Sequence, residues 1–230
     1  GRVGTIHETY QQTTFAHLLS HRAGLQPNIP MDQFGTFHRP VEDPIADRLE
    51  WVSIALAQEP AADLAEKNIY SNNGYIVAAA MLEAATGEPW EILIQREVFA
   101  PLGIEHAGFG DPAATRPQAH PRGHRFNDQH TAVMPAGADN PPALGPAGRV
   151  HMPLADIARY LHAHAHRPEH FLSEASFDRL HTPRLRRLLR LRVDHVTHRP
   201  TLAQRLEHHV VRRGRVRPKN RHRRRGRRQH

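Results

Sequence analysis

The charged residues of this sequence are distributed unevenly, and the balance changes at Pro183. The 230 residues include 31 Lys and Arg and 23 Asp and Glu, but 18 of the basic residues and only two of the acidic ones follow Pro183. The part up to Pro183 therefore carries a net charge of 13 − 21 = −8, and the part after it 18 − 2 = +16. A dense run of like charge with almost no aromatic residues cannot bury enough apolar area to fold. We expect a folded domain in residues 1–183 and a disordered basic segment in residues 184–230.

Length and composition narrow the class of protein further. The first 183 residues are enough for one domain with a sizeable core. The sequence has no cysteine, which excludes disulfides and thiolate chemistry but does not indicate a cellular compartment. No apolar run approaches the ~18 residues that cross a bilayer, and residues 1–10 lack the basic-then-apolar layout of a secretion signal. We therefore expect a soluble chain without a membrane span.

Helical periodicity recurs through the first 183 residues. After Asp43-Pro44, which would cap and begin a helix, apolar residues recur at helical spacing. Residues 73–86 are rich in Ala and apolar nearly all round, which predicts a buried helix that ends at Gly87. Further helices are predicted over 14–21, capped by Thr14 and ended near Gly24, and over 89–99, 153–165 and 173–180. Residues 110–148 predict a long irregular excursion, and no convincing alternating strand is present.

Four segments in this order resemble the serine beta-lactamase and penicillin-binding protein family in its broad sense, which includes D-alanyl-D-alanine carboxypeptidases and esterases. Residues 17–25, HLLSHRAGL, resemble the family segment LLSHxSGL, and residues 69–75, IYSNNGY, resemble YSNxGY. Residues 99–104 are similar to the family's PLGM helix end, and residues 146–160 to its PAGG and DLARF stretch. The four segments together cover most of the acidic part of the chain.

The resemblance implies a beta-lactamase/transpeptidase-like fold of the α/β (α+β) class, with an antiparallel sheet flanked by helices beside an all-helical lobe. Most of this chain would belong to the helical lobe and its loops. The implied chemistry is acyl transfer from an amide, ester or lactam to water, on a small-molecule or peptide-like substrate, without a cofactor or metal. Tyr70 matches the tyrosine of the family's proton relay, a general base, and Asn72 matches the asparagine that binds the substrate amide.

Two motifs of the family are missing from this sequence. No serine has a lysine three residues later, because Lys67 and Lys219 follow Leu64 and Val216 at that spacing. The third motif, a His or Lys, a small residue and a Gly on an edge strand, is not found after Pro183. We expect the chain as given to be a partial, inactive serine hydrolase without its nucleophile; a non-catalytic fragment or pseudogene product is the alternative.

Structural roles for the same residues stay open at this stage. Tyr70 could be a half-buried aromatic residue with a hydrogen-bonded hydroxyl, and Asn72 or Asn73 could cap a helix. Ser20 and His21 invite comparison with a Ser-His pair, but adjacent residues on a helix do not face each other, so we expect no catalysis there.

A histidine cluster, His162, His164 and His166, raises the question of a metal site. His162 and His166 share a helix face at a spacing that can bind zinc, but a zinc site needs three or four ligands. Additional ligands are conceivable at His120, His124 and Glu169, yet no pattern brings them together. A solvated helix face is the favoured interpretation.

The basic segment permits two further hypotheses. Arginine-rich runs bind phosphates without sequence recognition, so nucleic-acid binding is a third, less favoured function. The alternative is a shift of reading frame near Pro183, where the family resemblance stops. Codons permitted by residues 202–210 can spell Ser-His-Asn-Gly-Ser-Asn-Thr-Met in another frame, which resembles the family's HNGSNTMW motif. The gene sequence decides this point, since codons that cannot spell the motif in either alternative frame exclude it.

Overall fold

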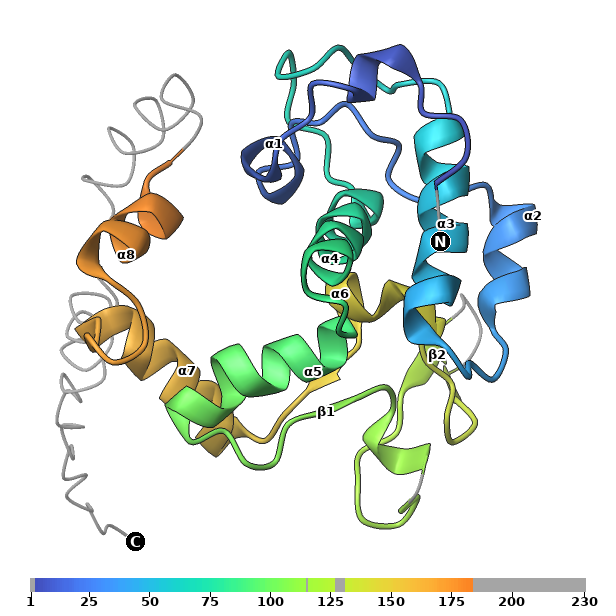
Figure 1. The fold of residues 1–230 in the computed structure, drawn as a ribbon. Helices are drawn as coiled ribbons and strands as arrows, with labels where there is room; N and C mark the ends of the chain where they lie inside the picture. The colour runs from blue at the N-terminus through green and yellow to red at the C-terminus, as the bar shows by residue number, and fades with distance from the viewer. Residues whose placement is uncertain (1–2, 115, 127–130, 184–230) are drawn as a thin grey trace, which may run out of the picture. The chain divides into compact units, whose positions relative to one another are not determined.

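A central helix, α4 (Asn72–Thr86), organises the part of the chain that the computed structural model describes, residues 3–114, 116–126 and 131–183 (Figure 1). The Ser71 hydroxyl caps it by accepting a hydrogen bond from the Gly74 amide at 3.2 Å. Gly87 ends it in the left-handed conformation, φ 74°, which glycine adopts without a Cβ clash. The predicted buried helix is therefore confirmed.

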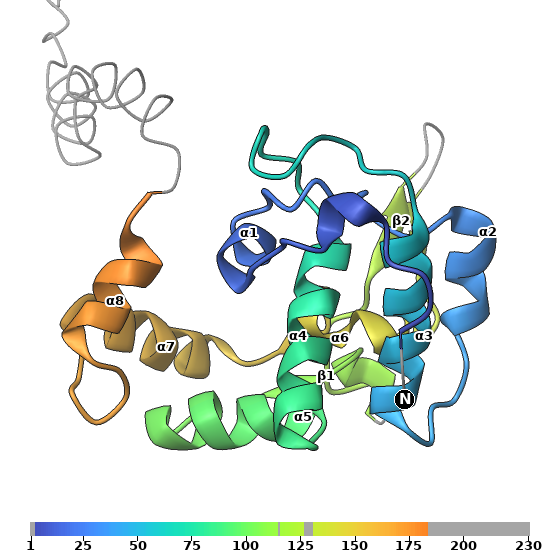
Figure 2. The same ribbon diagram turned by 45° about the horizontal axis from the view of Figure 1, so that its top comes forward.

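Four helices contact α4 along its length: α1 (Phe15–Leu19), α3 (Pro44–Ala57), α5 (Trp90–Ile94) and α6 (Gly145–Gly148). Figures 1 and 2 show α3 beside α4 and α5 across its C-terminal end. The turn η6 (Pro142–Leu144) contacts both α3 and α4. Because every one of these helices uses the same central helix, the position of α4 determines where the residues at its N-terminus lie.

The remaining elements extend this helical core: α2 (Met31–Phe34), α7 (Leu154–His166), α8 (Glu174–His181), the π-helical η3 (Gln95–Phe99), and the 3-10 turns η1 (Glu8–Tyr10), η2 (Gly35–Phe37), η4 (Ala100–Leu102) and η5 (Pro112–Ala114). All of them belong to one unit, Gly1–His181. The basic segment predicted to be disordered lies outside the described residues, and that expectation stays a prediction.

Four short strands form two antiparallel pairs, which the absence of alternation did not predict. β1 (Gly108–Phe109) pairs with β4 (Val150–His151), with Gly108 opposite His151. β2 (His124–Phe126) pairs with β3 (Thr131–Val133) inside the stretch expected to be irregular. Strands of two or three residues are too short to show a period of two, so the expectation of no strand was wrong for a physical reason.

The sequence predicted the N-caps of α3 and α1, but not the residue at which α1 ends. The Asp43 carboxylate accepts hydrogen bonds from the amides of Ile45 and Ala46, as expected for an N-cap before Pro44. Thr14 forms a reciprocal capping box with His17. However, α1 ends at Leu19, and the first left-handed residue after it is His21, φ 57°, rather than Gly24.

Aromatic and aliphatic side chains from α1, α3, α4 and η2 contribute to the core, and Phe34 of α2 packs against it. Trp51 is fully buried, and the rings of Phe34 and Phe37 meet it edge-on at 5.3 and 5.0 Å between centroids. Leu18 and Ile76 are also fully buried. Each such side chain contributes ~1.5–3 kcal/mol by leaving water. None of the described helices is long and apolar enough to cross a membrane.

A buried ion network ties three helices of this core together. The Arg48 guanidinium, 1% exposed, donates to both oxygens of Glu83, which is fully buried, and to both oxygens of Glu91. Burial alone would lower the pKa of Arg48, but these carboxylates outweigh it and raise the pKa. One Glu83 oxygen also accepts the Trp90 amide, at 2.8 Å, at the start of α5. The network therefore fixes α3, α4 and α5 relative to one another.

Replacing Arg48 by Met should destabilise the domain strongly, because Glu83 would remain buried without a cation. Removal of one partner of a buried pair costs about 3–5 kcal/mol, and we expect a loss of that size in urea denaturation. Arg96→Met is the matched control, since Arg96 pairs with Glu88 and Glu97 at the surface. Its denaturation midpoint should stay close to that of the unmodified chain. Equal losses for both variants would contradict this assignment.

Candidate functional site

The segment from Tyr70 to Asn73 is tied down immediately before and within the first turn of α4. The Ser71 hydroxyl donates to the Gln26 carbonyl at 2.7 Å, and the backbone N–H of Asn72 donates to the Pro27 carbonyl at 2.9 Å. A Cβ on Gly74 would lie 3.1 Å from the Leu18 carbonyl, so glycine permits the close approach of α4 to α1. The segment is therefore held against the loop that follows α1.

Tyr70 is held by its backbone while its side chain points away from the core. The side chain is 64% exposed, and within the described part of the chain its hydroxyl forms no hydrogen bond. Its ring lies against the imidazole of His21, with 4.6 Å between ring centroids. The alternative of a half-buried tyrosine with a satisfied hydroxyl is therefore wrong.

The two asparagines of the segment have different roles. Asn72 is partly buried, and its amide nitrogen donates to Asn28 at 2.9 Å. Asn73 is fully buried, accepts the Trp51 indole N–H at 2.9 Å and donates to the Gln26 carbonyl at 3.1 Å. Neither side chain caps α4, because Ser71 does so. Asn73 thus secures the segment to the core, and Asn72 lies at its accessible side.

His21 lies in the family-like segment 17–25, but the sequence did not predict that it contacts the Tyr70 segment. Its Nδ1 accepts a hydrogen bond from the Ser71 amide at 3.1 Å, and its ring contacts both Tyr70 and Tyr75. Burial lowers the pKa of His21. Burial also raises the pKa of Tyr75, with smaller contributions from Tyr70 and Tyr160. The positive φ of His21, 57°, is the structural sign of its special position, and the residue type alone does not reveal it in the sequence.

Lys67 and Ser20, which lie near this site in the sequence, make local contacts. Lys67, three residues before Tyr70, is exposed and pairs with the neighbouring Glu66 at 3.0 Å, as a surface lysine does. Ser20 donates to the Ala16 carbonyl within its own helical turn. The arrangement can therefore present a phenol and an amide to a substrate, while the described residues supply no activated serine.

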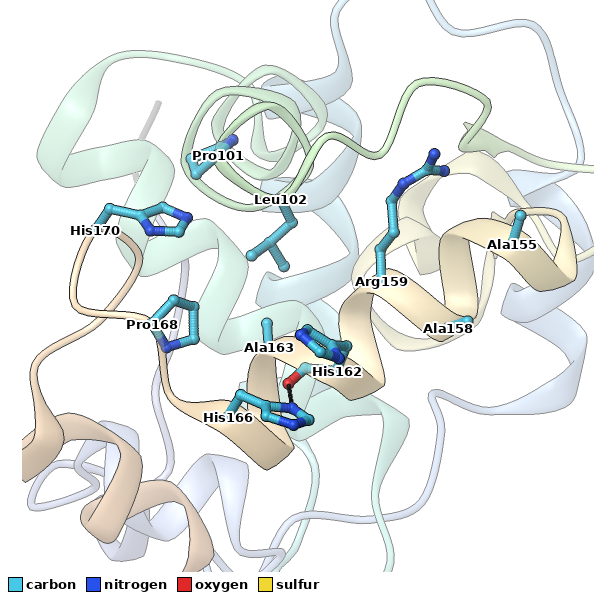
Figure 3. Close-up of a pocket in the computed structure, with 10 residues that line it drawn as sticks. All are labelled: Pro101, Leu102, Ala155, Ala158, Arg159, His162, Ala163, His166, Pro168 and His170. Atoms are coloured by element: carbon cyan, nitrogen blue, oxygen red, sulfur yellow. Dashed lines mark hydrogen bonds between the residues drawn. The ribbon is translucent and has the colours of Figure 1, made fainter.

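A separate cavity of about 590 Å³ lies between η4 and α7, away from this segment (Figure 3). Leu102 and Ala158 line it together with Arg159, His162 and His166. Tyr70 and Asn72 do not line it.

His162 and His166 share a face of α7, as expected from their spacing. The rings of His162 and His166 stack with 3.9 Å between centroids, and His164 contacts His181 instead. No group of three or more His, Cys, Asp or Glu residues that could hold a metal is formed by the described residues.

Comparison with known proteins decides the family. The Beta-lactamase family model matches residues 7–216, most of the chain. The chain belongs to the Beta-lactamase family. The match extends past Pro183, to residue 216, while the boundary at Pro183 and the shift of reading frame near it stay predictions.

Individual members of the family are only distantly similar. The unguisins hydrolase of Aspergillus violaceofuscus is 28% identical over 158 residues, 66% of this chain and 26% of that protein. The D-stereospecific amidohydrolase of a Streptomyces species superimposes with a TM-score of 0.60 at 19% identity, over 75% of this chain and 52% of that one. The D-amino acid amidase of Ochrobactrum anthropi SV3, solved with L-phenylalanine amide, gives 0.55 at 24%, over 75% and 48%.

These structural likenesses show the fold, which is that of beta-lactamases and transpeptidases, as the resemblance implied. The described residues form mainly its helical part, with few strands. The chain spans about a quarter of the curated relative, 26%, and about half of these two solved structures, 52% and 48%.

Gly24 should be far less tolerant of substitution than a glycine with the same backbone conformation elsewhere. Gly24 and Gly87 have φ of 73° and 74°, but a Cβ on Gly24 would lie 2.1 Å from the Ala62 carbonyl oxygen, whereas a Cβ on Gly87 would meet open space. Gly87→Ala should cost about 1–2 kcal/mol for the left-handed conformation. Gly24→Ala should cost about 1–3 kcal/mol more because of the clash. Urea denaturation of both variants measures the difference, and equal costs would refute the close packing of this loop.

Proposed function

We propose that this chain carries the Tyr-Xaa-Asn part of a serine hydrolase site, with Tyr70 as the general base and Asn72 as a ligand of the substrate's amide or carbonyl group. The observation that carries the proposal is the state of Tyr70. Its backbone neighbours are tied to the loop after α1, yet its phenol is exposed and its hydroxyl has no partner among the described residues. A residue whose backbone is held this firmly, and whose functional group is free, is suited to act on a ligand.

The chemistry of a phenol sets a condition on this role. A tyrosine in water loses its proton near pH 10, so it accepts a proton at neutral pH only when nearby cations favour the phenolate. The Ser-Xaa-Xaa-Lys motif of the family would supply such a cation together with the nucleophile. The reaction then runs as acyl transfer: the serine oxygen attacks the acyl carbon, the leaving group takes a proton through the relay, and water releases the acyl group.

An amide is the favoured substrate class. Two of the similar proteins are named for amide hydrolysis, an amidohydrolase and an amidase. The amide group of Asn72 offers both a donor and an acceptor, which suits the N–H and C=O of an amide bond. Esters and lactams share the acyl carbon and remain substrates that an activity assay would compare.

The chain as its sequence stands should not form an acyl-enzyme, because none of its serines has a lysine three residues later. The alternative to a hydrolase is therefore that the chain acts as a non-catalytic member of the family. Nucleic-acid binding rests on residues outside the described ranges. A binding assay at rising salt would separate it from both other functions, since phosphate contacts weaken steeply with salt.

We expect a fluorophosphonate or penicillin-type probe to leave the purified chain unlabelled in intact-mass spectrometry. A polypeptide that joins this chain to a Ser-Xaa-Xaa-Lys segment and an edge strand from a relative should label at that serine. In that polypeptide, Tyr70→Phe should slow acylation by about 10²–10⁴-fold, as the loss of a general base does. Tyr160→Phe is the control, because Tyr160 is a tyrosine of α7 outside the segment.

Two results would contradict the proposal. Stoichiometric labelling of the unmodified chain at any serine would mean that the nucleophile has been misassigned. A labelled joined polypeptide whose acylation rate is unchanged by Tyr70→Phe would remove Tyr70 from the reaction.

A further inference from the structure

His21 holds the Tyr70 segment at two points that flank Tyr70 in the chain. The His21 carbonyl accepts a hydrogen bond from the Ile69 amide at 2.9 Å, and the His21 Nδ1 accepts one from the Ser71 amide at 3.1 Å. The residue before Tyr70 and the residue after it are thus bound by the same histidine. The backbone of Tyr70 has little freedom to rotate while both bonds are present.

The imidazole ring also limits where the phenol can lie. It packs against the ring of Tyr70 at 4.6 Å and an interplanar angle of 38°, and against Tyr75 at 5.3 Å and 42°. Tyr75 is anchored in turn, since its hydroxyl donates to the Leu19 carbonyl at 3.3 Å. His21 therefore fills the space between the anchored Tyr75 and the exposed Tyr70.

The backbone conformation of His21 makes this placement possible. Its φ of 57° lies in the left-handed region, which residues other than glycine, asparagine and aspartate rarely occupy. The turn reverses the chain directly after α1 and brings the ring over the segment that precedes α4. A glycine would make the same turn without strain but would supply neither the ring nor Nδ1.

We propose that neutral His21 is a positioning residue that orients Tyr70 for proton transfer and releases it when the ring is protonated. The inference rests on the proposed function of Tyr70. In the neutral form that accepts the Ser71 N–H at Nδ1, the ring proton is on Nε2. A second proton from solvent goes to Nδ1, which then is a donor that faces another donor. The hydrogen bond to Ser71 is lost, so the backbone beside Tyr70 keeps only the bond from Ile69 to the His21 carbonyl.

The surroundings of His21 bear on this pH dependence. Its titratable neighbours are the phenols of Tyr70 and Tyr75, and Tyr160 of α7 lies close enough to Tyr75 to raise the pKa of Tyr75. The guanidinium of the adjacent Arg22 is held by the Ala65 carbonyl. No carboxylate contacts the ring among the described residues, and burial lowers the pKa of His21 below the ordinary 6.5. The unfolded chain then takes up this proton at higher pH than the folded chain, so His21 weakens folding as pH falls below about 6.5.

The test uses the full chain labelled with ¹⁵N and with ¹³C at the tyrosine rings. Between pH 8 and 5, NMR should show the His21 imidazole with its proton on Nε2 at high pH and a midpoint below 6.5. The Ser71 amide and the Tyr70 ring signals should change with that same midpoint. Independent titration of these signals, or a constant Tyr70 signal while His21 titrates, would overturn the proposal.

Two substitutions separate the hydrogen bond from the ring. His21→Asn tolerates the left-handed backbone and places an oxygen where Nδ1 was, without a group that titrates, so the Ser71 and Tyr70 signals of this variant should not change with pH. His21→Gly relieves the backbone but removes the acceptor, so both signals should be displaced at every pH. If His21→Gly fails to fold, a pH-dependent Tyr70 signal in His21→Asn is still sufficient to refute the proposal.

The same variants distinguish this inference from the proposed function. In the joined polypeptide with its Ser-Xaa-Xaa-Lys segment, His21→Asn should abolish the loss of acylation rate that the unmodified site shows below the His21 midpoint. If the NMR coupling holds but Tyr70→Phe leaves acylation unchanged, His21 positions Tyr70 and the proposed function fails. If Tyr70→Phe slows acylation but the coupling is absent, the function stands and the inference about His21 fails.

Discussion

The buried guanidinium of Arg48 is the interaction on which this helical core depends most. It comes from α3 and binds Glu83 near the end of α4 and Glu91 in α5, so one side chain joins α3 to two helices that follow it at a distance in the sequence. A buried charge without partners costs several kcal/mol, so the arrangement of the three helices has little freedom to change. The C-terminal half of α4 is thus secured by charge, and its N-terminal half by apolar packing and the bonds of Asn73.

This fixed helix explains why a loop segment can carry a precisely placed side chain. Loops ordinarily have more freedom than the helices they join. Here Ser71 and Asn73 extend the order of α4 backward into the segment, and the loop after α1 covers it from the other side. Tyr70 is the point where this order ends at the surface. The role proposed for Tyr70 requires a rigid support and an open face, and the anchored backbone and exposed phenol are consistent with that proposal.

Local signals in the sequence predicted local structure well. Asp43 and Thr14 were recognisable as caps because a cap depends on residues two to four positions away. The Tyr-Xaa-Asn segment could be found by resemblance because the family conserves its order along the chain. Ser71 as the cap of α4 was missed, since Asn72 and Asn73 are equally good capping residues and only the backbone conformation distinguishes them.

Contacts between distant residues could not be predicted in the same way. His21 meets Ser71 across 50 positions, and Arg48 meets Glu83 across 35. Neither pair has a pattern in the sequence, because a contact of this kind depends on how the helices pack. The pairing of β1 with β4 could not be predicted either, because each strand has only two residues and the whole excursion between η5 and α6 separates them.

We infer that the Tyr70 segment is preformed in this chain and does not need a substrate or further protein to order it. Hydrogen exchange of the backbone amides of Ile69, Ser71 and Asn72 measures this directly, because each donates to the loop around His21 and Pro27. We expect exchange about as slow as in the body of α4, because the segment and the helix would open as one cooperative unit. Exchange as fast as that of the exposed Lys67 amide, with α4 still protected, would contradict it.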